Sequence, residues 1–273
     1  MGGLGNQLFQ IFATIAYALE NKTSFVFFYT DILGGDEGTK RNTYWNNFLS
    51  SLKKFTRESV SIKFMYKEEG FNYSKLKPYS DDLMLSGYFQ SHKYFEEYYD
   101  PICKLIKLQD IKAKIMSEYS HNYNEIVSMH FRLGDYKTLQ DYHIILDYEY
   151  YEKALGFLLN KSLPRQGSNQ ERHILYFCEK QDNEYVENTI NKLKIKFPTC
   201  VFEKANDEIE DWKQMIIMSC CKDNIIANST FSWWGAYFND NTDKNICYPS
   251  QWFGYKNSHL VTADLFPETW NKI

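Results

Sequence analysis

Residues 126–136 read Ile-Val-Ser-Met-His-Phe-Arg-Leu-Gly-Asp-Tyr, an apolar run that ends in a group of ionisable side chains. A short apolar run of this length predicts a buried strand, and Gly134 permits a sharp turn directly after it. His130 and Arg132 are two residues apart, so they lie on one side of the strand. Open α/β sheets bind ligands outside the carboxyl ends of their strands. The pattern therefore predicts a parallel sheet with His130, Arg132 and Asp135 at its ligand-binding edge.

Strand-like and helix-like segments alternate from this strand to the C-terminus. The strand-like segments are 126–130, 174–178, 199–203, 224–227 and 245–248, and the helix-like segments are 148–159, 184–195, 211–221 and 230–238. Such alternation predicts an α/β fold with a parallel, doubly wound sheet.

The first half of the chain is less regular. Residues 6–20 carry apolar side chains at helical spacing, and residues 25–29 form a strand-like apolar run. We expect loops and short helices over the polar residues 31–80. The glycine-rich turn at residues 2–7 suggests another strand–turn–helix unit. Only Met1 precedes that turn, so we expect either that its leading strand is missing or that the start is misassigned.

Length and composition describe a globular protein. The chain has 273 residues, of which 44% are hydrophobic and 24% charged, and this length is enough for one large domain or two of ordinary size. The net charge of −4 and the lack of a basic stripe argue against nucleic acid as a partner. No transmembrane segment or signal peptide is recognisable, which favours a cytoplasmic protein of bacterial or viral type, free or peripheral to a membrane. The sequence does not indicate an oligomeric state.

Several site chemistries are absent from the sequence. No pair of cysteines has C-x-x-C spacing, and no cysteine–histidine cluster has zinc spacing. We expect Cys178, Cys200 and Cys247, which lie in apolar runs, to be buried free thiols. The Asp-x-Asp pattern that clasps a metal–diphosphate is missing as well. The sequence therefore predicts neither a metal nor a cofactor.

Three further motifs have both a chemical and a purely structural interpretation. Asn228 or Ser229 is a suitable N-cap, and hydroxyl side chains and N–H groups at a helix start form an anion site; capping alone is the alternative. Asp207 follows a strand-like run and could accept N–H bonds from a guanine edge, but a solvated acidic loop fits equally. The Gly2–Gln7 turn could approach a ligand or simply join a strand to a helix. For the motif at residues 126–136, the purely structural alternative is that Arg132 and Asp135 form only a surface ion pair.

Taken together, three motifs resemble one enzyme family. They are Gly-Gly-Leu-Gly-Asn-Gln at 2–7, His-Phe-Arg-Leu-Gly-Asp-Tyr at 130–136, and Asn-Ser-Thr-Phe-Ser-Trp-Trp-Gly-Ala-Tyr at 228–237. In this order they are similar to the α-1,2-fucosyltransferases of glycosyltransferase family 11. The resemblance implies a GT-B-like fold of two Rossmann-type parallel-sheet halves facing a cleft. Residues 1–122 would form the acceptor-side domain and residues 123–273 the GDP-fucose-binding domain.

The same resemblance implies an inverting, metal-independent transfer of L-fucose from GDP-fucose to a galactose hydroxyl of a glycan. It implies that Arg132 binds the β-phosphate and stabilises departing GDP, that His130 lies beside the donor, and that Asn6 reaches donor or acceptor. Asp135 is our candidate base. The donor-binding residues implied or inferred are Gly3, Gly5, Asp207, Asn228, Ser229, Thr230, Phe231 and Ser232.

Two departures from the family pattern and two other functions stay open. The strand before Gly2 is absent, and Glu179 lies where the family often has Ser-Asp-Asp. One alternative function is a GDP-sugar transferase of other linkage or donor. The other is a catalytically inactive protein that binds a sugar or nucleotide. The intact Arg132 and segment 229–232 favour an active enzyme.

Overall fold

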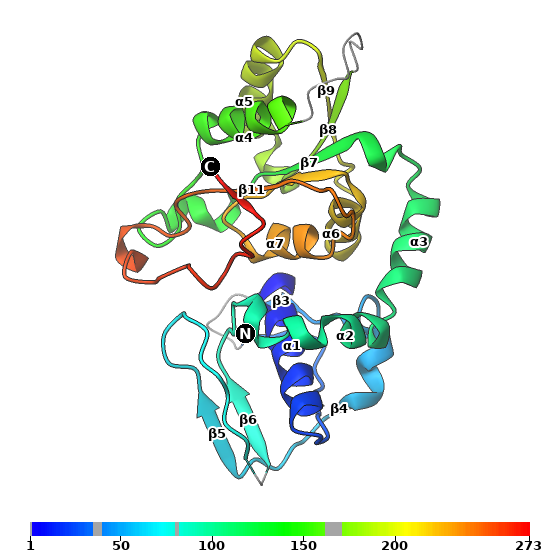
Figure 1. Ribbon diagram of the computed structural model, residues 1–273, viewed down its shortest axis with the longest axis vertical. Coiled ribbons are helices and arrows are strands. Elements are labelled where there is room, and N and C mark those ends of the chain that lie inside the picture. Colours follow the sequence, from blue (N-terminus) through cyan, green and yellow to red (C-terminus); the bar gives the residue numbers. More distant parts are fainter. Residues whose placement is uncertain (1, 35–39, 80–81, 162–170) are drawn as a thin grey trace. The chain divides into compact units, whose positions relative to one another are not determined.

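The computed structural model describes residues 2–34, 40–79, 82–161 and 171–273 and divides into two compact units (Figure 1). The first unit comprises residues up to Ala113 together with Leu260–Pro267. The second comprises Lys114–His259 and Glu268–Ile273. The chain thus passes from one unit to the other inside helix α3 (Leu108–Glu118), upstream of the boundary predicted at 122/123, and returns once near its end.

A six-stranded sheet forms the framework of the second unit. Its strands are β7 (Ile126–His130), β8 (Arg172–Phe177), β9 (Cys200–Lys204), β10 (Asp223–Ile225), β11 (Ile246–Tyr248) and β12 (Asn271–Lys272). Their order is β12-β11-β10-β7-β8-β9, and all neighbours pair in parallel. From β7 the chain builds outward to β9, and it then resumes on the other side of β7 with β10. The topological switch point therefore lies between β7 and β10.

Four helices cover this sheet: α4 (Tyr148–Lys161), α5 (Asn183–Lys196), α6 (Asp211–Cys220) and α7 (Thr230–Tyr237). Figure 1 shows α4 and α5 on one face and α6 and α7 on the other. Every strand and helix predicted for this half is confirmed to within two residues at each end. The predicted α/β fold class is confirmed, and two compact units are what a GT-B-like protein requires.

The burial pattern explains why these segments adopt their structure. All five residues of β7 are buried, as a central parallel strand covered on both faces requires. Helix α5 buries Val186, Ile190 and Leu193, which recur at helical spacing along one face. On α7, the indole of Trp233 packs against Trp270 with ring centroids 5.4 Å apart.

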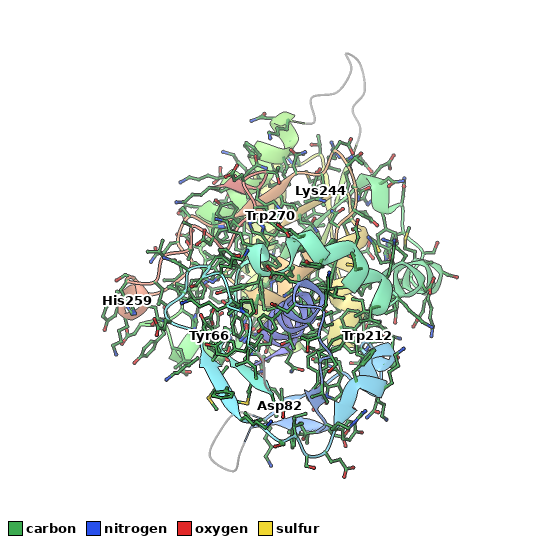
Figure 2. All side chains as sticks on the ribbon, turned by 60° about the horizontal axis from the view of Figure 1, so that its bottom comes forward. Tyr66, Asp82, Trp212, Lys244, His259 and Trp270 are labelled. Atoms are coloured by element: carbon green, nitrogen blue, oxygen red, sulfur yellow. The ribbon has the colours of Figure 1, made fainter. Side chains whose placement is uncertain are left out.

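The first unit is organised around α1 (Leu4–Glu20), the helix predicted for residues 6–20. Its other regular elements are strands β1 (Phe27–Phe28), β2 (Ile32–Leu33), β3 (Arg41–Asn42), β4 (Thr56–Arg57), β5 (Phe64–Lys67) and β6 (Leu83–Ser86), and helix α2 (Tyr99–Leu105). Within the described residues these strands form pairs only: β1-β4 and β5-β6 are parallel, and β2-β3 is antiparallel. The Rossmann-type sheet is accordingly seen in the second unit. Figure 2 shows Tyr66, from β5 of the first unit, and Trp270, just before β12 of the second.

Short 3₁₀ helices complete the connections. They span Ser50–Phe55, His92–Tyr94 and Glu96–Tyr98 in the first unit, and Tyr123–Glu125, Gly134–Thr138, Lys180–Asp182 and Tyr255–Asn257 in the second. Residues 31–80 hold four short strands as well as a 3₁₀ helix, so the expectation of loops and helices alone is wrong there. Two-residue strands show no alternation that a sequence reading could detect.

Several compositional expectations can be compared with the structure. Cys178, Cys200 and Cys247 are buried and free, as predicted. Among the described helices none has the length and apolarity needed to cross a bilayer. Among all the described residues, no group of three or more His, Cys, Asp and Glu side chains could hold a metal ion. Metal independence remains a prediction that only an assay can test.

Candidate active site

Arg132 lies at the carboxyl edge of the sheet, where the strand order reverses. The pairing of β7 with β8 places His130 opposite Phe177. Continuing this parallel register by two residues brings Arg132 beside Glu179. On the other side of β7, strand β10 ends shortly before Asn228. Residues from three strand ends therefore meet at the switch point, where open α/β sheets bind ligands.

The Arg132 guanidinium is held by two carboxylates. Its Nη1 donates to Oε1 of Glu179 and its Nη2 to Oδ1 of Asp135. The guanidinium also lies over the ring of Tyr136, with Cζ 5.1 Å from the ring centroid. Burial disfavours its charge, but Asp135 and Glu179 outweigh that effect and raise the pKa of Arg132. The result is a fixed cation at the sheet edge, both of whose arms already bind anionic oxygens.

The turn that follows Arg132 depends on Gly134 and a buried carboxylate. Gly134 has φ +41°, a left-handed conformation, and a Cβ there would lie 3.0 Å from both Glu179 oxygens. Its N–H donates to Oδ2 of Asp182 at 2.8 Å. Oδ1 of the same carboxylate accepts from Nζ of Lys137 at 2.7 Å. Asp182, only 1% exposed, thus anchors the turn that carries Asp135.

His130 is a buried, neutral imidazole. It is 8% exposed, and its Nδ1 has no hydrogen-bond partner among the described residues. Burial and the neighbouring charge of Arg132 lower the pKa of His130 to about 3. Its ring lies 5.5 Å from that of Phe231, between centroids. At neutral pH the side chain can make neutral hydrogen bonds and cannot supply positive charge.

The start of α7 lies at the same edge. Ser229 is the N-cap, with φ −141° and ψ 129°, and its Oγ accepts from the N–H of Phe231 at 3.3 Å. Thr230 is the first helical residue. Ser232 is buried, and its hydroxyl donates to the Ser229 carbonyl at 3.3 Å. Ser232 thus stabilises the turn, whereas the helix start offers the N–H groups that favour an anion.

Asn228 connects the loops around this edge. Its Nδ2 donates to the carbonyls of Ile144, at 2.9 Å, and Trp252, at 3.1 Å. Its own carbonyl accepts from the Tyr136 hydroxyl at 3.1 Å. The side chain is 1% exposed and its Oδ1 has no partner among the described residues. Asn228 therefore positions the segment between β10 and α7 relative to the Arg132 turn.

Asp207 lies apart from this group, in the loop after the edge strand β9. Its Oδ1 accepts from Nζ of Lys204 at 2.5 Å and its Oδ2 from Nδ2 of Asn183 at 2.7 Å. Burial raises its pKa, but these two hydrogen bonds outweigh burial and leave the pKa of Asp207 below the usual value. Both oxygens thus already have one donor each, and a guanine edge would have to use the remaining lone pairs.

The other candidate residues belong to the first unit and are described there by themselves. Gly3 is the N-cap of α1, and Gly5 and Asn6 lie in its first turn. Oδ1 of Asn6 accepts from Nε2 of Gln90 at 2.9 Å. A Cβ on Gly2 would overlap the Asn6 amide, so the glycine leaves room for it. Gln90 thus orients Asn6, a role that the sequence did not reveal.

The structure also identifies residues of the switch point that sequence reasoning missed. Glu179 was noted only as a departure from the family pattern, yet it pairs with Arg132. Asp182 and Tyr136 were not singled out, although each holds the turn or the loop beside that arginine. The sequence did contain a signal for the contact between Glu179 and Arg132. Glu179 lies two residues after the end of β8, and Arg132 lies two residues after the end of β7.

Comparisons with known proteins identify the family of the chain. The family model described as Glycosyl transferase family 11 matches residues 13–273. The chain is 28% identical to the O-antigen biosynthesis glycosyltransferase WbnK of Escherichia coli, over 96% of each protein. It is 26% identical to an α-1,2-colitosyltransferase of Escherichia coli, over 100% of this chain and 96% of that protein.

Two solved structures show weaker similarity. The E. coli ADP-heptose lipopolysaccharide heptosyltransferase II has a TM-score of 0.38 and 13% identity, over 60% of this chain and 43% of that one. A GDP complex of the Arabidopsis thaliana FUT1 mutant R284K has a TM-score of 0.46 and 12% identity, over 91% and 68% of the respective chains. The family model, which spans nearly the whole sequence, leads to the conclusion that this chain belongs to glycosyl transferase family 11.

Proposed function

We propose that this protein transfers L-fucose from GDP-fucose to a galactose hydroxyl of a glycan, forming an α-1,2 linkage with inversion and without a metal ion or cofactor. The observation that carries the proposal is the fixed Arg132 cation beside the start of α7 at the switch point. Membership of a glycosyltransferase family implies a nucleotide sugar and a glycan acceptor as substrates. An α-1,2-glycosyltransferase among the relatives supports the linkage.

The chemistry we assign to Arg132 is stabilisation of the leaving group. Negative charge grows on GDP as the fucosyl bond breaks, and a preorganised cation lowers the energy of that transition state. Asp135 and Glu179 use two of the five N–H donors of Arg132, so a diphosphate can bind through the remaining donors or replace one of the carboxylates. Glu179 is the carboxylate we expect to give way, because it reaches Arg132 from a different strand end, whereas Asp135 belongs to the same turn as Arg132. The positive end of the α7 dipole would favour the remaining phosphate oxygens, while the Ser229 hydroxyl keeps the Phe231 N–H capped.

His130 and Asp135 take different roles in this scheme. A neutral His130 beside the donor can share a hydrogen bond with it but adds no charge, which leaves Arg132 as the cation there. Asp135 is the candidate base for the acceptor hydroxyl. It can accept that proton only if its carboxylate turns from Arg132 toward the acceptor. We retain Asp207 as the guanine contact, with Asn6, Gly3 and Gly5 as donor or acceptor contacts from the first unit.

A second donor follows from one specific observation. The relative named α-1,2-colitosyltransferase aligns with the whole of this chain. Nucleotide-activated colitose is therefore the second candidate donor, with the same α-1,2 linkage. The phosphate-binding residues proposed above would serve either sugar, because they contact the part of the donor that leaves.

The test is a transfer assay with the purified protein in EDTA. GDP-fucose and GDP-colitose are offered separately with β-galactoside acceptors, and released GDP and product linkage are measured. An α-1,2-fucosylated product in EDTA is the expected result, and a strong preference for GDP-colitose would replace fucose in the proposal. GDP binding without transfer to any acceptor would instead support a catalytically inactive binding protein.

A further inference from the structure

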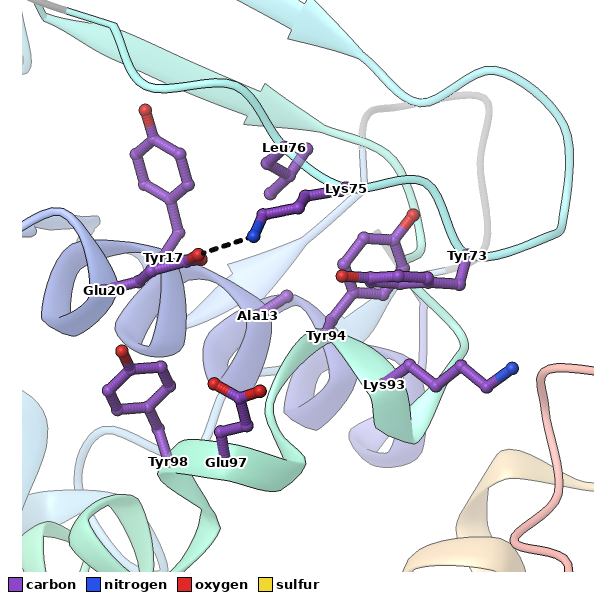
Figure 3. Close-up of a pocket in the computed structure, with 10 residues that line it drawn as sticks. All are labelled: Ala13, Tyr17, Glu20, Tyr73, Lys75, Leu76, Lys93, Tyr94, Glu97 and Tyr98. Atoms are coloured by element: carbon purple, nitrogen blue, oxygen red, sulfur yellow. Dashed lines mark ion pairs between the residues drawn. The ribbon is translucent and has the colours of Figure 1, made fainter.

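The first unit contains a cavity of about 70 Å³ beside helix α1 that none of the roles above uses (Figure 3). Ala13 and Tyr17 of α1 form one side. The loop through Tyr73 and Leu76 forms another, and the segment from Lys93 to Tyr98 closes it from below. All of these residues belong to one compact unit. The cavity is therefore a property of that unit alone.

Tyrosine hydroxyls and one carboxylate hold the irregular wall in place. The Tyr17 hydroxyl donates to the Lys77 carbonyl at 3.2 Å and accepts from the Tyr79 N–H at 3.1 Å. At the other end of the loop, the N–H of Tyr73 donates to Oδ2 of Asp264 at 3.0 Å. Leu76 fixes the middle by packing in a small apolar core. The wall is thus organised before any ligand arrives, which reduces the entropy lost on binding.

The lining combines aromatic rings with polar groups. Tyr73 and Tyr94 form an edge-on pair with centroids 4.8 Å apart. Figure 3 shows the Glu97 carboxylate and the Tyr98 hydroxyl pointing up toward α1, where Glu20 is paired with Lys75. Within the described residues, no hydrogen bond or ion pair holds the side chains of Glu97 and Tyr98. They are acceptors and donors available to a ligand.

This combination suits a neutral sugar. Aromatic faces cover the apolar C–H surface of a pyranose, while a carboxylate and a hydroxyl bind its hydroxyl groups. A water molecule needs about 10–15 Å³ of such volume, so the cavity has room for roughly five water molecules, which the polar groups of a sugar could displace. The lining contains two carboxylates, Glu20 and Glu97, and two lysines, Lys75 and Lys93, and this balance of charge suits a neutral ligand.

We propose that this cavity is a distal subsite that binds a neutral sugar residue of the acceptor glycan, away from the sugar that is fucosylated. The inference rests on the proposed glycosyl transfer and on Asn6 as a contact near the reacting groups. Tyr17 follows Asn6 by 11 residues on α1, or about 16 Å at 1.5 Å per residue. That span exceeds one sugar ring, so the subsite would recognise a sugar further along an oligosaccharide.

The kinetic test compares a short and a long acceptor. Lactose and the tetrasaccharide lacto-N-neotetraose are assayed with wild type, Glu97→Gln and Tyr98→Phe. Neutralising the Glu97 acceptor or deleting the Tyr98 hydroxyl should raise the KM for the tetrasaccharide about ten-fold and leave that for lactose unchanged. Asp100→Asn, which removes an exposed carboxylate outside the cavity, is the matched control. Equal effects on both acceptors, or no effect on either, would overturn the subsite.

A binding measurement separates this inference from the proposed function. Saturation-transfer NMR with lacto-N-neotetraose, without donor, reports contact even if no transfer occurs. Binding to wild type and Asp100→Asn that is about ten-fold weaker in Glu97→Gln and Tyr98→Phe supports the subsite whatever the transfer assay gives. Absence of binding to wild type, or equal binding to every variant, rejects it.

Discussion

The two units build their candidate sites from different materials. In the second unit, charged side chains project from the ends of paired strands in a six-stranded sheet. In the first, a helix and an irregular loop line a small cavity, and the Tyr17 hydroxyl holds the loop. The comparison teaches that the site proposed to stabilise developing charge uses rigid backbone to hold opposite charges close together. The site proposed for a neutral sugar uses aromatic rings on a tethered loop.

Arg132→Ala should have the largest effect. Loss of a cation that stabilises the leaving group is expected to lower kcat/KM for GDP-fucose by about 10²- to 10³-fold. Steady-state GDP release measures it, with Arg57→Ala, an exposed arginine of the first unit, as the control. Circular dichroism would establish that the variant folds. Turnover near the wild-type value would show that Arg132 does not stabilise the leaving group. The contrast between a charged site in the second unit and an aromatic site in the first would then fail.

His130 should make stability depend on pH. Its folded pKa of about 3 lies below the unfolded value of 6.5, so the unfolded state alone takes up this proton as pH falls from 6.5 toward 3. The stability present above 6.5 is lost in that window, amounting to about 2 kcal/mol between about pH 7 and pH 5. Urea unfolding at both pH values measures it.

The His130→Gln variant is the reference for that experiment, because glutamine does not titrate and all other histidines stay in place. Its unfolding free energy should fall less over the same pH range. An identical pH slope in both proteins would mean that His130 is accessible and protonated in the folded state.

Tyr17→Phe tests the tethered loop of the first unit. It deletes one hydroxyl that bonds the Lys77 carbonyl and the Tyr79 N–H. We expect a loss of about 1 kcal/mol in local stability and faster hydrogen exchange at the Tyr79 amide. Tyr88→Phe, at an exposed tyrosine, should leave that exchange rate unchanged. Unchanged exchange in Tyr17→Phe would show that the hydroxyl does not hold the loop.

Glu179→Gln should have the smallest effect, and in the opposite direction. Removing the carboxylate that competes for Arg132 should tighten GDP binding roughly two- to five-fold, because half-exposed pairs contribute little. Isothermal titration measures it, with Glu187→Gln on the exposed face of α5 removing the same charge elsewhere. Weaker GDP binding in Glu179→Gln would make this carboxylate part of the donor site.

The second unit could be predicted well because its segments are long and regularly patterned. The five buried residues of β7 and the periodic apolar positions of α5 are visible in the sequence. Strand β12, with two residues, was missed because only its pairing with β11 defines it. Most of the first unit was harder for the same reason, since β1 to β4 each contain two residues.

The candidate site divides in the same way. Arg132, His130 and Ser229 were identified from residue type and position at a strand end or helix start. Glu179 was not, because its contact with Arg132 depends on the register between two strands. The return of residues 260–267 to the first unit was also hidden, although Asp264 there holds the Tyr73 loop. Such contacts join residues far apart in the chain and leave no local pattern.

By itself, the sequence determined the α/β class and the order of strands and helices in the second half, and it supplied the side chains that we propose bind a diphosphate. These properties follow from the spacing of apolar residues and from the chemical type of single side chains, both of which can be read from each segment by itself. Only the tertiary structure decided which carboxylates hold Arg132, that Asp207 is already hydrogen-bonded, and that four tyrosines surround a cavity beside α1. Those properties arise from strand register, burial and long-range hydrogen bonds, which exist only after the chain has folded.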